Sequence, residues 1–108
     1  MALCAGISAH SLFEDFDDMT PFKKVVDTNL MGCAYPTKYA LKYMKKDLSK
    51  TKSQKGHIIV LSSFSGEFGV WYRSAYCASK FAVNGFFESL RMELNEKMDF
   101  TVVCPITV

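Results

Sequence analysis

The sequence lacks the features that would mark a metal centre or a membrane span. Its 108 residues include two histidines, and its four cysteines form no C-x-x-C pair, so a metal site is not expected. No apolar run is long enough to cross a bilayer. The chain also starts without a basic segment followed by a long apolar stretch, which argues against a secretory signal.

Charge of one sign is not in marked excess either. The 13 basic and 11 acidic residues leave a net charge of +2, which indicates no particular partner. The lysine-rich segment 42–55 has two interpretations: an anion-binding patch for nucleic acid or lipid, or the solvated end of a helix with its loop. We favour the second and expect no nucleic-acid partner, because no aromatic residue interleaves with the lysines from Lys45 onward.

The sequence does contain enough apolar material for one packed domain. Hydrophobic residues make up 49% of the chain and aromatic residues 14%, which is a globular composition. The cysteines stand far apart in apolar surroundings, so we expect four reduced, mostly buried thiols: Cys4, Cys33, Cys77 and Cys104. Reduced thiols fit a reducing compartment, and a cytoplasmic location is expected for the chain as written.

The apolar pattern of the second half predicts a strand–helix–strand unit. Residues 57–61 form a continuous apolar run, typical of a strand that is buried on both faces of a parallel sheet. Residues 74–97 show helical spacing, and residues 100–104 resemble a second buried strand that stops before Pro105. Because such crossovers join parallel strands, an α/β fold is predicted.

The first half predicts a short strand and an interrupted helix. Residues 1–4 resemble the end of a strand. Thr20 and Pro21 give a helix start, with Thr20 as the N-cap. A glycine and a proline interrupt the helical spacing that follows. We therefore expect two helices, or one helix that is kinked near Asn29.

Tyr76 and Lys80 form the most informative pair of side chains. Residues four apart on a helix have β-carbons about 5–6 Å apart. A cation beside a phenol stabilises the phenolate, which suits proton transfer at neutral pH. Lys80 also falls on the apolar stripe of its helix and near the N-terminal end, where the helix dipole disfavours cations. The competing interpretation is a lysine that snorkels beside a half-buried core tyrosine.

A serine pair, Ser62 and Ser63, ends the predicted strand just upstream. Serine at a strand end is commonly only a turn former. In open α/β sheets, however, ligands bind in the crevice beyond the carboxyl ends of the strands. Both serines would then face the same crevice as Tyr76 and Lys80.

These residues resemble the central part of a short-chain dehydrogenase/reductase. Residues 76–80, YCASK, fit that family's Y-x-x-x-K motif, and Ser63 precedes the tyrosine by 13 positions, as the family's catalytic serine does. Residues 27–30, DTNL, resemble its D-x-N-L segment, and residues 4–8, CAGIS, resemble its N-A-G-I-S segment. Residues 80–91 are similar to the branch that includes the 11β-hydroxysteroid dehydrogenases and their membrane-associated relatives.

The resemblance implies a Rossmann-type doubly wound parallel sheet and hydride transfer between NAD or NADP and an alcohol or carbonyl. Tyr76 would be the general acid/base, and Lys80 would stabilise its phenolate and bind the nicotinamide ribose. Ser63 would orient the substrate carbonyl. Asn29 would hold a water in a proton relay that leads to Lys80. Further cofactor contacts would come from Ala5, Gly6 and Pro105.

The resemblance also predicts the extent of the domain. We expect residues 1–108 to form the central and catalytic part of one such domain. The glycine-rich N-terminal half that holds the cofactor pyrophosphate and the C-terminal substrate-capping segment would lie outside it. Cys4 replaces the asparagine of N-A-G, and Ile106 replaces the glycine that usually follows Pro105. Association with the endoplasmic reticulum membrane is expected if an anchor precedes the chain.

Two functions of different class are then open. In the first, the chain is part of an oxidoreductase for a steroid, a retinoid or another lipid-like compound, because Phe68, Trp71 and Tyr72 would supply an apolar wall. In the second, it is a catalytically silent truncated form that acts by association. The two long helices would provide a homo-oligomer interface. A third interpretation, a chance motif in an unrelated α/β binding domain, would make all the matching segments coincidental.

Overall fold

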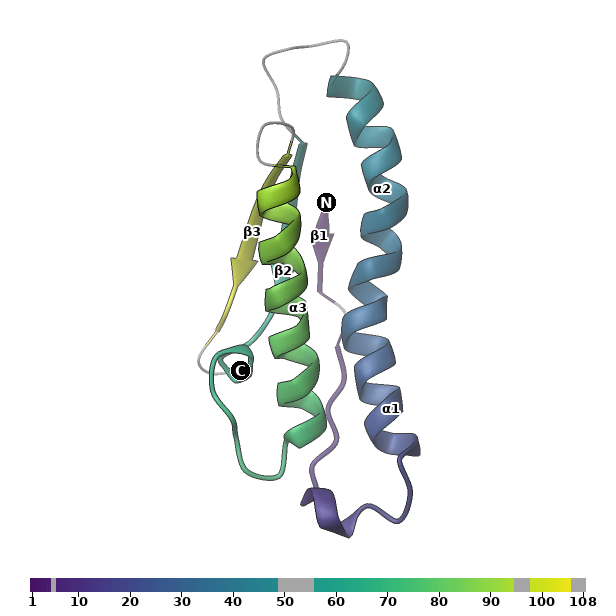
Figure 1. Cartoon of the computed structure of the whole chain (residues 1–108), viewed down its shortest axis with the longest axis vertical. Helices are drawn as coiled ribbons and strands as arrows, with labels where there is room; N and C mark the ends of the chain where they lie inside the picture. The colour runs from purple at the N-terminus through teal and green to yellow at the C-terminus, as the bar shows by residue number, and fades with distance from the viewer. Residues whose placement is uncertain (5, 49–55, 95–97, 106–108) are drawn as a thin grey trace.

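The computed structural model describes residues 1–4, 6–48, 56–94 and 98–105. They form a parallel three-stranded sheet in the order β1 (Ala2–Leu3), β2 (Gly56–Leu61) and β3 (Met98–Val103). The helices α1 (Thr20–Val26), α2 (Gly32–Leu48) and α3 (Ser74–Glu93) run alongside these strands (Figure 1). The predicted α/β class and the strand–helix–strand unit are therefore confirmed.

The register of β2 and β3 brings their carboxyl ends together. The strands pair along their whole length, from Gly56 opposite Met98 to Leu61 opposite Val103. Gly56 lies close to its partner at the first pair: a Cβ built on it would be 2.9 Å from the sulfur of Met98, so the flexible methionine side chain would have to shift. The segments that follow the two strands consequently start side by side, at one edge of the sheet.

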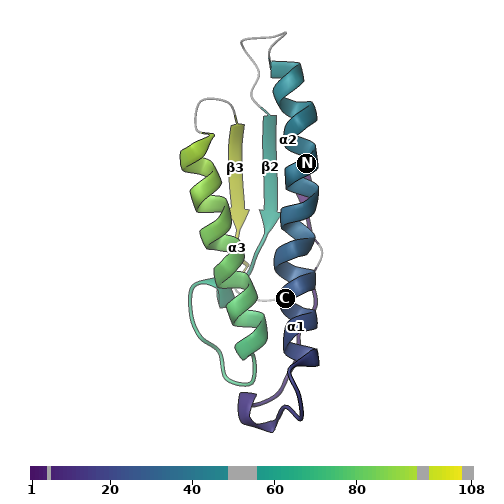
Figure 2. The same ribbon diagram turned by 45° about the vertical axis from the view of Figure 1, so that its right-hand side comes forward.

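The core lies between the sheet and the two long helices. Ile58 and Val60 of β2 and Phe100 of β3 are buried together with Val83 and Phe87 of α3. Figure 2 shows α3 beside β3 and α2 beside β2. Because the apolar stripe of α3 packs into this core, the first turns of the helix are fixed in place next to the ends of the strands.

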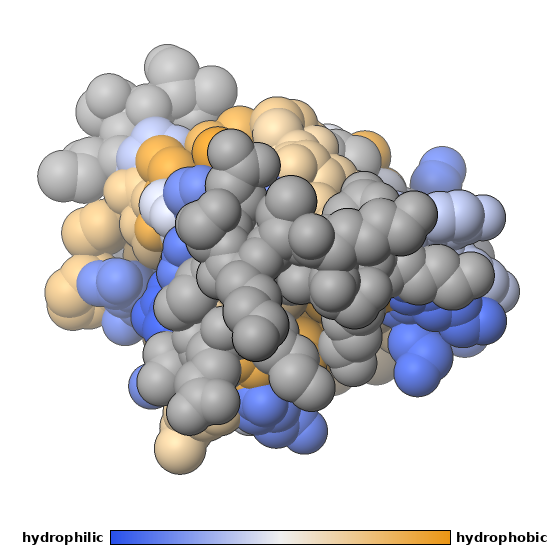
Figure 3. Space-filling model, turned by 90° about the horizontal axis from the view of Figure 1, so that it is seen from above, coloured by the Kyte–Doolittle hydropathy of each residue, from blue (hydrophilic) through white to orange (hydrophobic). Residues whose placement is uncertain are grey.

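The other face of the sheet is open in the described chain, so the prediction of strands buried on both faces was wrong here. Ile58 and Val60 are fully buried, whereas Ile59 and Leu61 are each 40% exposed and Val103 is 41% exposed. Successive side chains of a strand point to opposite faces, and the helices cover only one of them. Figure 3, the view from above, shows hydrophobic residues along the upper edge and on the left of the molecule, next to hydrophilic ones.

A π-helical turn, η2 (Asp27–Met31), joins α1 to α2. The interruption expected near Asn29 is therefore confirmed, and it takes the form of a wider turn with i, i+5 bonding. The start of α1 differs slightly from the prediction. Thr20 is its first helical residue, and the carboxylate of Asp18 accepts a hydrogen bond from the Thr20 N–H at 2.8 Å.

Parts of two predicted segments fall outside the described residues. The lysine-rich segment 42–55 enters α2 as far as Leu48, and residues 49–55 are not described. The helix expected over 74–97 is observed to Glu93. None of the described helices has the length and apolar character that a membrane span requires. The cysteines form no disulfide; two are buried, one is half-buried and one is exposed: Cys33, Cys77, Cys104 and Cys4.

Candidate active site

Tyr76 and Lys80 stand on the first two turns of α3. The Lys80 side chain is 4% exposed, which confirms its predicted place on the core-facing stripe. Its Nζ lies 5.5 Å from the centroid of the Tyr76 ring and donates a long hydrogen bond, 3.4 Å, to the Leu61 carbonyl at the end of β2. The buried ammonium group is thus held between the sheet edge and the phenol.

The serine pair follows the last residue of β2, as predicted. Ser63 is the N-cap of the short 3-10 helix η3 (Phe64–Gly66), and its Oγ accepts a hydrogen bond from the Ser65 N–H at 3.2 Å. Since this bond uses a lone pair of the hydroxyl, the Ser63 O–H remains available to donate. Ser62 is buried, and its N–H donates to the Val103 carbonyl of β3 at 2.8 Å.

These side chains meet at one pocket of about 300 Å³. It brings together most of the residues that the sequence analysis selected, while the predicted cofactor contact Ala5 lies outside the described residues. The pocket is lined by Cys4, Gly6, Ile7, Ser8, Leu61, Ser62, Ser63, Arg73, Tyr76, Lys80 and Pro105.

Asn29 does not line this pocket but lies directly behind it. Its side chain is fully buried; Oδ1 accepts from the Ile7 N–H at 2.7 Å, and Nδ2 donates to the Ile7 carbonyl at 2.8 Å and to Ser79 Oγ at 3.0 Å. A Cβ added to Gly6 would lie 3.5 Å from Asn29 Oδ1 and 3.6 Å from Lys80 Nζ. Asn29 therefore ties the loop after β1 to α3 and fixes one wall of the pocket.

Arg73 is a pocket residue that the sequence analysis missed. Its guanidinium lies 5.8 Å from the centroid of the Tyr76 ring and donates to Ser8 Oγ at 3.4 Å. The preceding residue, Tyr72, has a φ of 65°, an uncommon value for a residue with a side chain, and its carbonyl accepts from the Ser11 N–H at 2.8 Å. The available signal was a cation three residues before Tyr76, one turn away on the helix.

The pocket is electrostatically positive. Arg73 and Lys80 both approach the Tyr76 ring, and no aspartate or glutamate is among the lining residues. Burial raises the pKa of the nearby Cys33 thiol; the charge of Lys80 opposes this effect, and Cys4 reinforces it. Such a site can stabilise a phenolate and can accept a polar or anionic ligand group. In the described ranges, no three His, Cys, Asp or Glu side chains are grouped as metal ligands.

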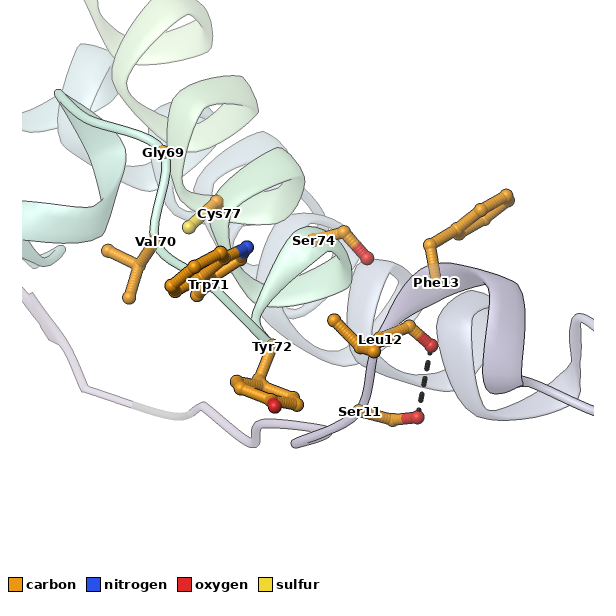
Figure 4. A pocket seen from close by; sticks show the side chains of 9 residues that line it. All are labelled: Ser11, Leu12, Phe13, Gly69, Val70, Trp71, Tyr72, Ser74 and Cys77. Atoms are coloured by element: carbon orange, nitrogen blue, oxygen red, sulfur yellow. Dashed lines mark hydrogen bonds between the residues drawn. The ribbon is translucent and has the colours of Figure 1, made fainter.

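The predicted aromatic wall lies elsewhere. Phe68, Trp71 and Tyr72 are 54%, 84% and 47% exposed, and none of them lines the pocket of Tyr76 and Lys80. Trp71 and Tyr72 border a second, shallow cavity of about 610 Å³, next to Leu12 and Cys77 (Figure 4). Consecutive residues at the start of α3 point to different sides, so Cys77 faces this second cavity and Tyr76 faces the catalytic pocket.

Comparison with known proteins identifies relatives over almost the whole chain. The family model for short chain dehydrogenases matches residues 1–108. The chain is 38% identical over 101 residues to the 11-beta-hydroxysteroid dehydrogenase-like 4A protein of Arabidopsis thaliana, covering 94% of this chain and 31% of the relative. It is 36% identical to 11-beta-hydroxysteroid dehydrogenase A of Sesamum indicum, with 94% and 27% covered.

Solved structures give the same result. ElxO with NADP bound matches with a TM-score of 0.84 and 31% identity, over 96% of this chain and 40% of that one. Ligand-free aldohexose dehydrogenase of Thermoplasma acidophilum matches with a TM-score of 0.86 and 29% identity, over 98% and 39%. The partial Rossmann-type fold is confirmed, as is the predicted resemblance. This chain, which spans about 31% of the first curated relative, belongs to the short-chain dehydrogenase family.

Proposed function

We propose that the protein transfers a hydride between NAD or NADP and an alcohol or carbonyl substrate. The observation that carries this proposal is the single pocket at which Ser63, Tyr76 and Lys80 meet. Family membership supports the reaction class. The alternative, a catalytically silent form that acts only by association, is not favoured, because the described chain retains the acid, the cation and the hydroxyl together.

Tyr76 is the proposed general acid/base. When bound, the cofactor supplies the hydride for the carbonyl carbon. During reduction, the Tyr76 hydroxyl gives its proton to the carbonyl oxygen, and during oxidation the phenolate takes the alcohol proton back. Lys80, with its Nζ 5.5 Å from the ring centroid, stabilises the phenolate and offers donors to the nicotinamide ribose.

Ser63 is the proposed oxyanion donor. Because its oxygen already accepts from the Ser65 N–H, its O–H is left to point at the substrate carbonyl, where negative charge develops. Asn29 is assigned the end of a proton relay to Lys80. Its side chain is occupied by Ile7 and Ser79, so the relay would use the backbone of the π turn and a water.

The residues of the pocket fit a nicotinamide cofactor. The buried Ser62 Oγ has no hydrogen-bond partner among the described residues, and the two cations face no carboxylate. Gly6 and Pro105 line the same pocket, and Ala5 is assigned a contact beside them. ElxO carries NADP, and 4-hydroxyisoleucine dehydrogenase was solved with NADH and succinate, so both cofactors remain within the proposal.

The proposed substrate is a steroid or another lipid-like alcohol or carbonyl. Curated relatives named for 11-beta-hydroxysteroids support this class. The exposed aromatic residues Phe68, Trp71 and Tyr72 stand at the same end of the sheet as the pocket, although outside its lining.

Replacing Tyr76 by phenylalanine tests the catalytic assignment. Tyr76→Phe in the full-length protein should lower turnover at least about 100-fold, because the acid/base is lost. NADPH or NADH affinity should change little, since the ring and Lys80 remain. Tyr43→Phe is the matched control and should keep activity, because Tyr43 is exposed on α2 and does not line the pocket. Retained turnover in the Tyr76 variant would reject the assignment.

We also propose a homo-oligomer that pairs through the long helices. Three tyrosines, four residues apart, form an exposed stripe on α2: Tyr35, Tyr39 and Tyr43, at 60%, 60% and 73% exposure. Aromatic side chains are enriched at protein interfaces. Tyr39→Glu should shift the sedimenting species toward monomer with the circular dichroism spectrum unchanged, whereas Lys42→Glu on the same helix is the control. An unaltered sedimentation profile in the tyrosine variant would exclude this interface.

A further inference from the structure

The proposed reaction uses Ser63 but leaves Ser62 without a role. Ser62 is 4% exposed, and its Oγ has no hydrogen-bond partner among the described residues. A buried hydroxyl without a partner lowers stability, because the group has lost its water and gained nothing in return. A hydrophobic residue of similar size at this position would continue the apolar strand β2 without the cost of a buried hydroxyl.

Ser62 is also firmly held in place. Its own N–H donates to the Val103 carbonyl at 2.8 Å, and the Phe64 N–H donates to the Pro105 carbonyl at 3.0 Å. Between these two bonds, Ser63 caps η3. Because the backbone on both sides is fixed to the segment of β3, the hydroxyl cannot reach a partner by a simple shift of the chain.

The residue that carries this hydroxyl lines the catalytic pocket, although Oγ itself is shielded from solvent. Ser62 lines it next to Ser63, Tyr76 and Lys80, and directly follows Leu61, whose carbonyl accepts from Lys80 Nζ. In open α/β sheets, a dinucleotide lies across the carboxyl ends of the strands. The first residue beyond β2 is therefore on the side of the pocket where the cofactor would be bound.

We propose that the Ser62 side chain turns its hydroxyl toward the pocket when the cofactor binds and hydrogen-bonds the nicotinamide–ribose end of the cofactor. The inference rests on the proposed function. A serine hydroxyl can both donate and accept, and this end of the cofactor carries an amide and hydroxyl groups that do the same. The stability that the hydroxyl costs the unliganded protein is recovered as affinity when the cofactor binds.

In the part of the chain that the structure describes, two other buried side-chain polar atoms lack a partner, and their surroundings are different. Thr37 Oγ1 is on α2, in a groove that also involves Leu41 and Leu90, away from the catalytic pocket. Asn84 Oδ1 belongs to a side chain whose Nδ2 already donates to the Gly66 carbonyl at 3.0 Å. Thr37 therefore offers a matched control: the same kind of orphaned hydroxyl, without a place in the site.

The test measures stability and cofactor affinity separately in the full-length protein. Ser62→Ala should raise the melting temperature of the unliganded protein by roughly 2–4 °C, because an unsatisfied group is removed. It should weaken NADH or NADPH binding, followed by cofactor fluorescence, by roughly three- to tenfold, the value of one hydrogen bond. Thr37→Val should raise the melting temperature and leave the affinity unchanged.

The outcomes are distinct. Unchanged affinity in Ser62→Ala would overturn the inference and leave the proposed function standing. If the parent protein binds neither cofactor, both the proposed function and the inference fail. Ser62→Cys has a slightly larger side chain that hydrogen-bonds only weakly, so it should weaken binding as well; it replaces the alanine variant if that variant does not fold. If Ser62→Ala and Ser62→Cys both lower the melting temperature, the hydroxyl has a hydrogen-bond partner within the protein. This result would also overturn the inference.

Discussion

At the scale of single residues, the strongest argument for the role of Lys80 is the free-energy cost of burying its charge. The side chain is buried, and among the described residues its one hydrogen bond is the 3.4 Å contact to the Leu61 carbonyl. No carboxylate lines the pocket to neutralise it. Buried charges are normally paired, and this one is also near the unfavourable end of the helix dipole. An apolar residue at this position would pack into the core at no electrostatic cost. The presence of a lysine therefore indicates a functional role for position 80.

Lys80→Met should therefore separate stability from activity. The substitution keeps the length of the side chain and removes the unpaired charge, so the melting temperature should rise by roughly 2–5 °C. Turnover should fall at least about 100-fold, because the phenolate of Tyr76 loses its cation. Lys42→Met, at an exposed position of α2, should alter neither the melting temperature nor the turnover much. A melting temperature that falls in Lys80→Met would show that the charge is well satisfied in the folded state.

At the scale of elements, the periodic segments could be predicted from sequence and the irregular ones could not. The stripe through Val83 and Phe87 fixes both the helix and the inward side of Lys80, so this part of the site followed from spacing alone. The interruption at Asn29 was expected, but a glycine and a proline in the sequence do not specify a π turn. The aromatic residues were predicted at the wrong cavity, because the positive φ of Tyr72 turns the chain just before α3. This turn could not be predicted from the sequence.

The start of α1 gives a pH-dependent prediction for one element. Hydrogen bonds from the Thr20 backbone and side chain hold the pKa of Asp18 below its usual value. A depressed pKa contributes stability that is present above the unfolded value, near 3.9, and lost as the pH falls through the folded value. Asp18→Ala should lower the melting temperature by about 2 °C near pH 7, because the helix loses its cap.

The difference between Asp18→Ala and the parent should shrink at strongly acidic pH, below the lowered folded pKa, where the carboxyl is protonated in both folded and unfolded chains. Asp17→Ala is the matched control, since no hydrogen bond to that neighbouring carboxylate is found among the described residues. Thermal melts followed by circular dichroism at both pH values provide the measurement. A difference of equal size at low pH would mean that Asp18 acts through something other than its charge.

At the scale of the whole molecule, the sheet determines what the described chain leaves exposed. The helices cover one face, and the other presents Ile59, Leu61 and Val103, each about 40% exposed. Parallel sheets are normally covered on both faces, which is why their strands are continuously apolar. The apolar residues that led us to predict burial on both faces therefore form an exposed apolar surface on the second face of the 108-residue chain. Such a surface favours self-association. This misprediction is informative. The apolar composition of a strand indicates how many of its faces need to be covered, and not how many are covered in the described chain.

The period of two along β2 allows the open face to be tested against the core face of the same strand. In the 108-residue chain, Ile59→Thr combined with Leu61→Thr should reduce dye binding and self-association while the circular dichroism spectrum is retained, because threonine keeps the strand propensity and removes apolar surface. Ile58→Thr combined with Val60→Thr makes the same change on the buried face, where two unpaired hydroxyls should unfold the chain. Equal behaviour of the two double variants would contradict the observed orientation of β2, since a shift of one residue exchanges the faces.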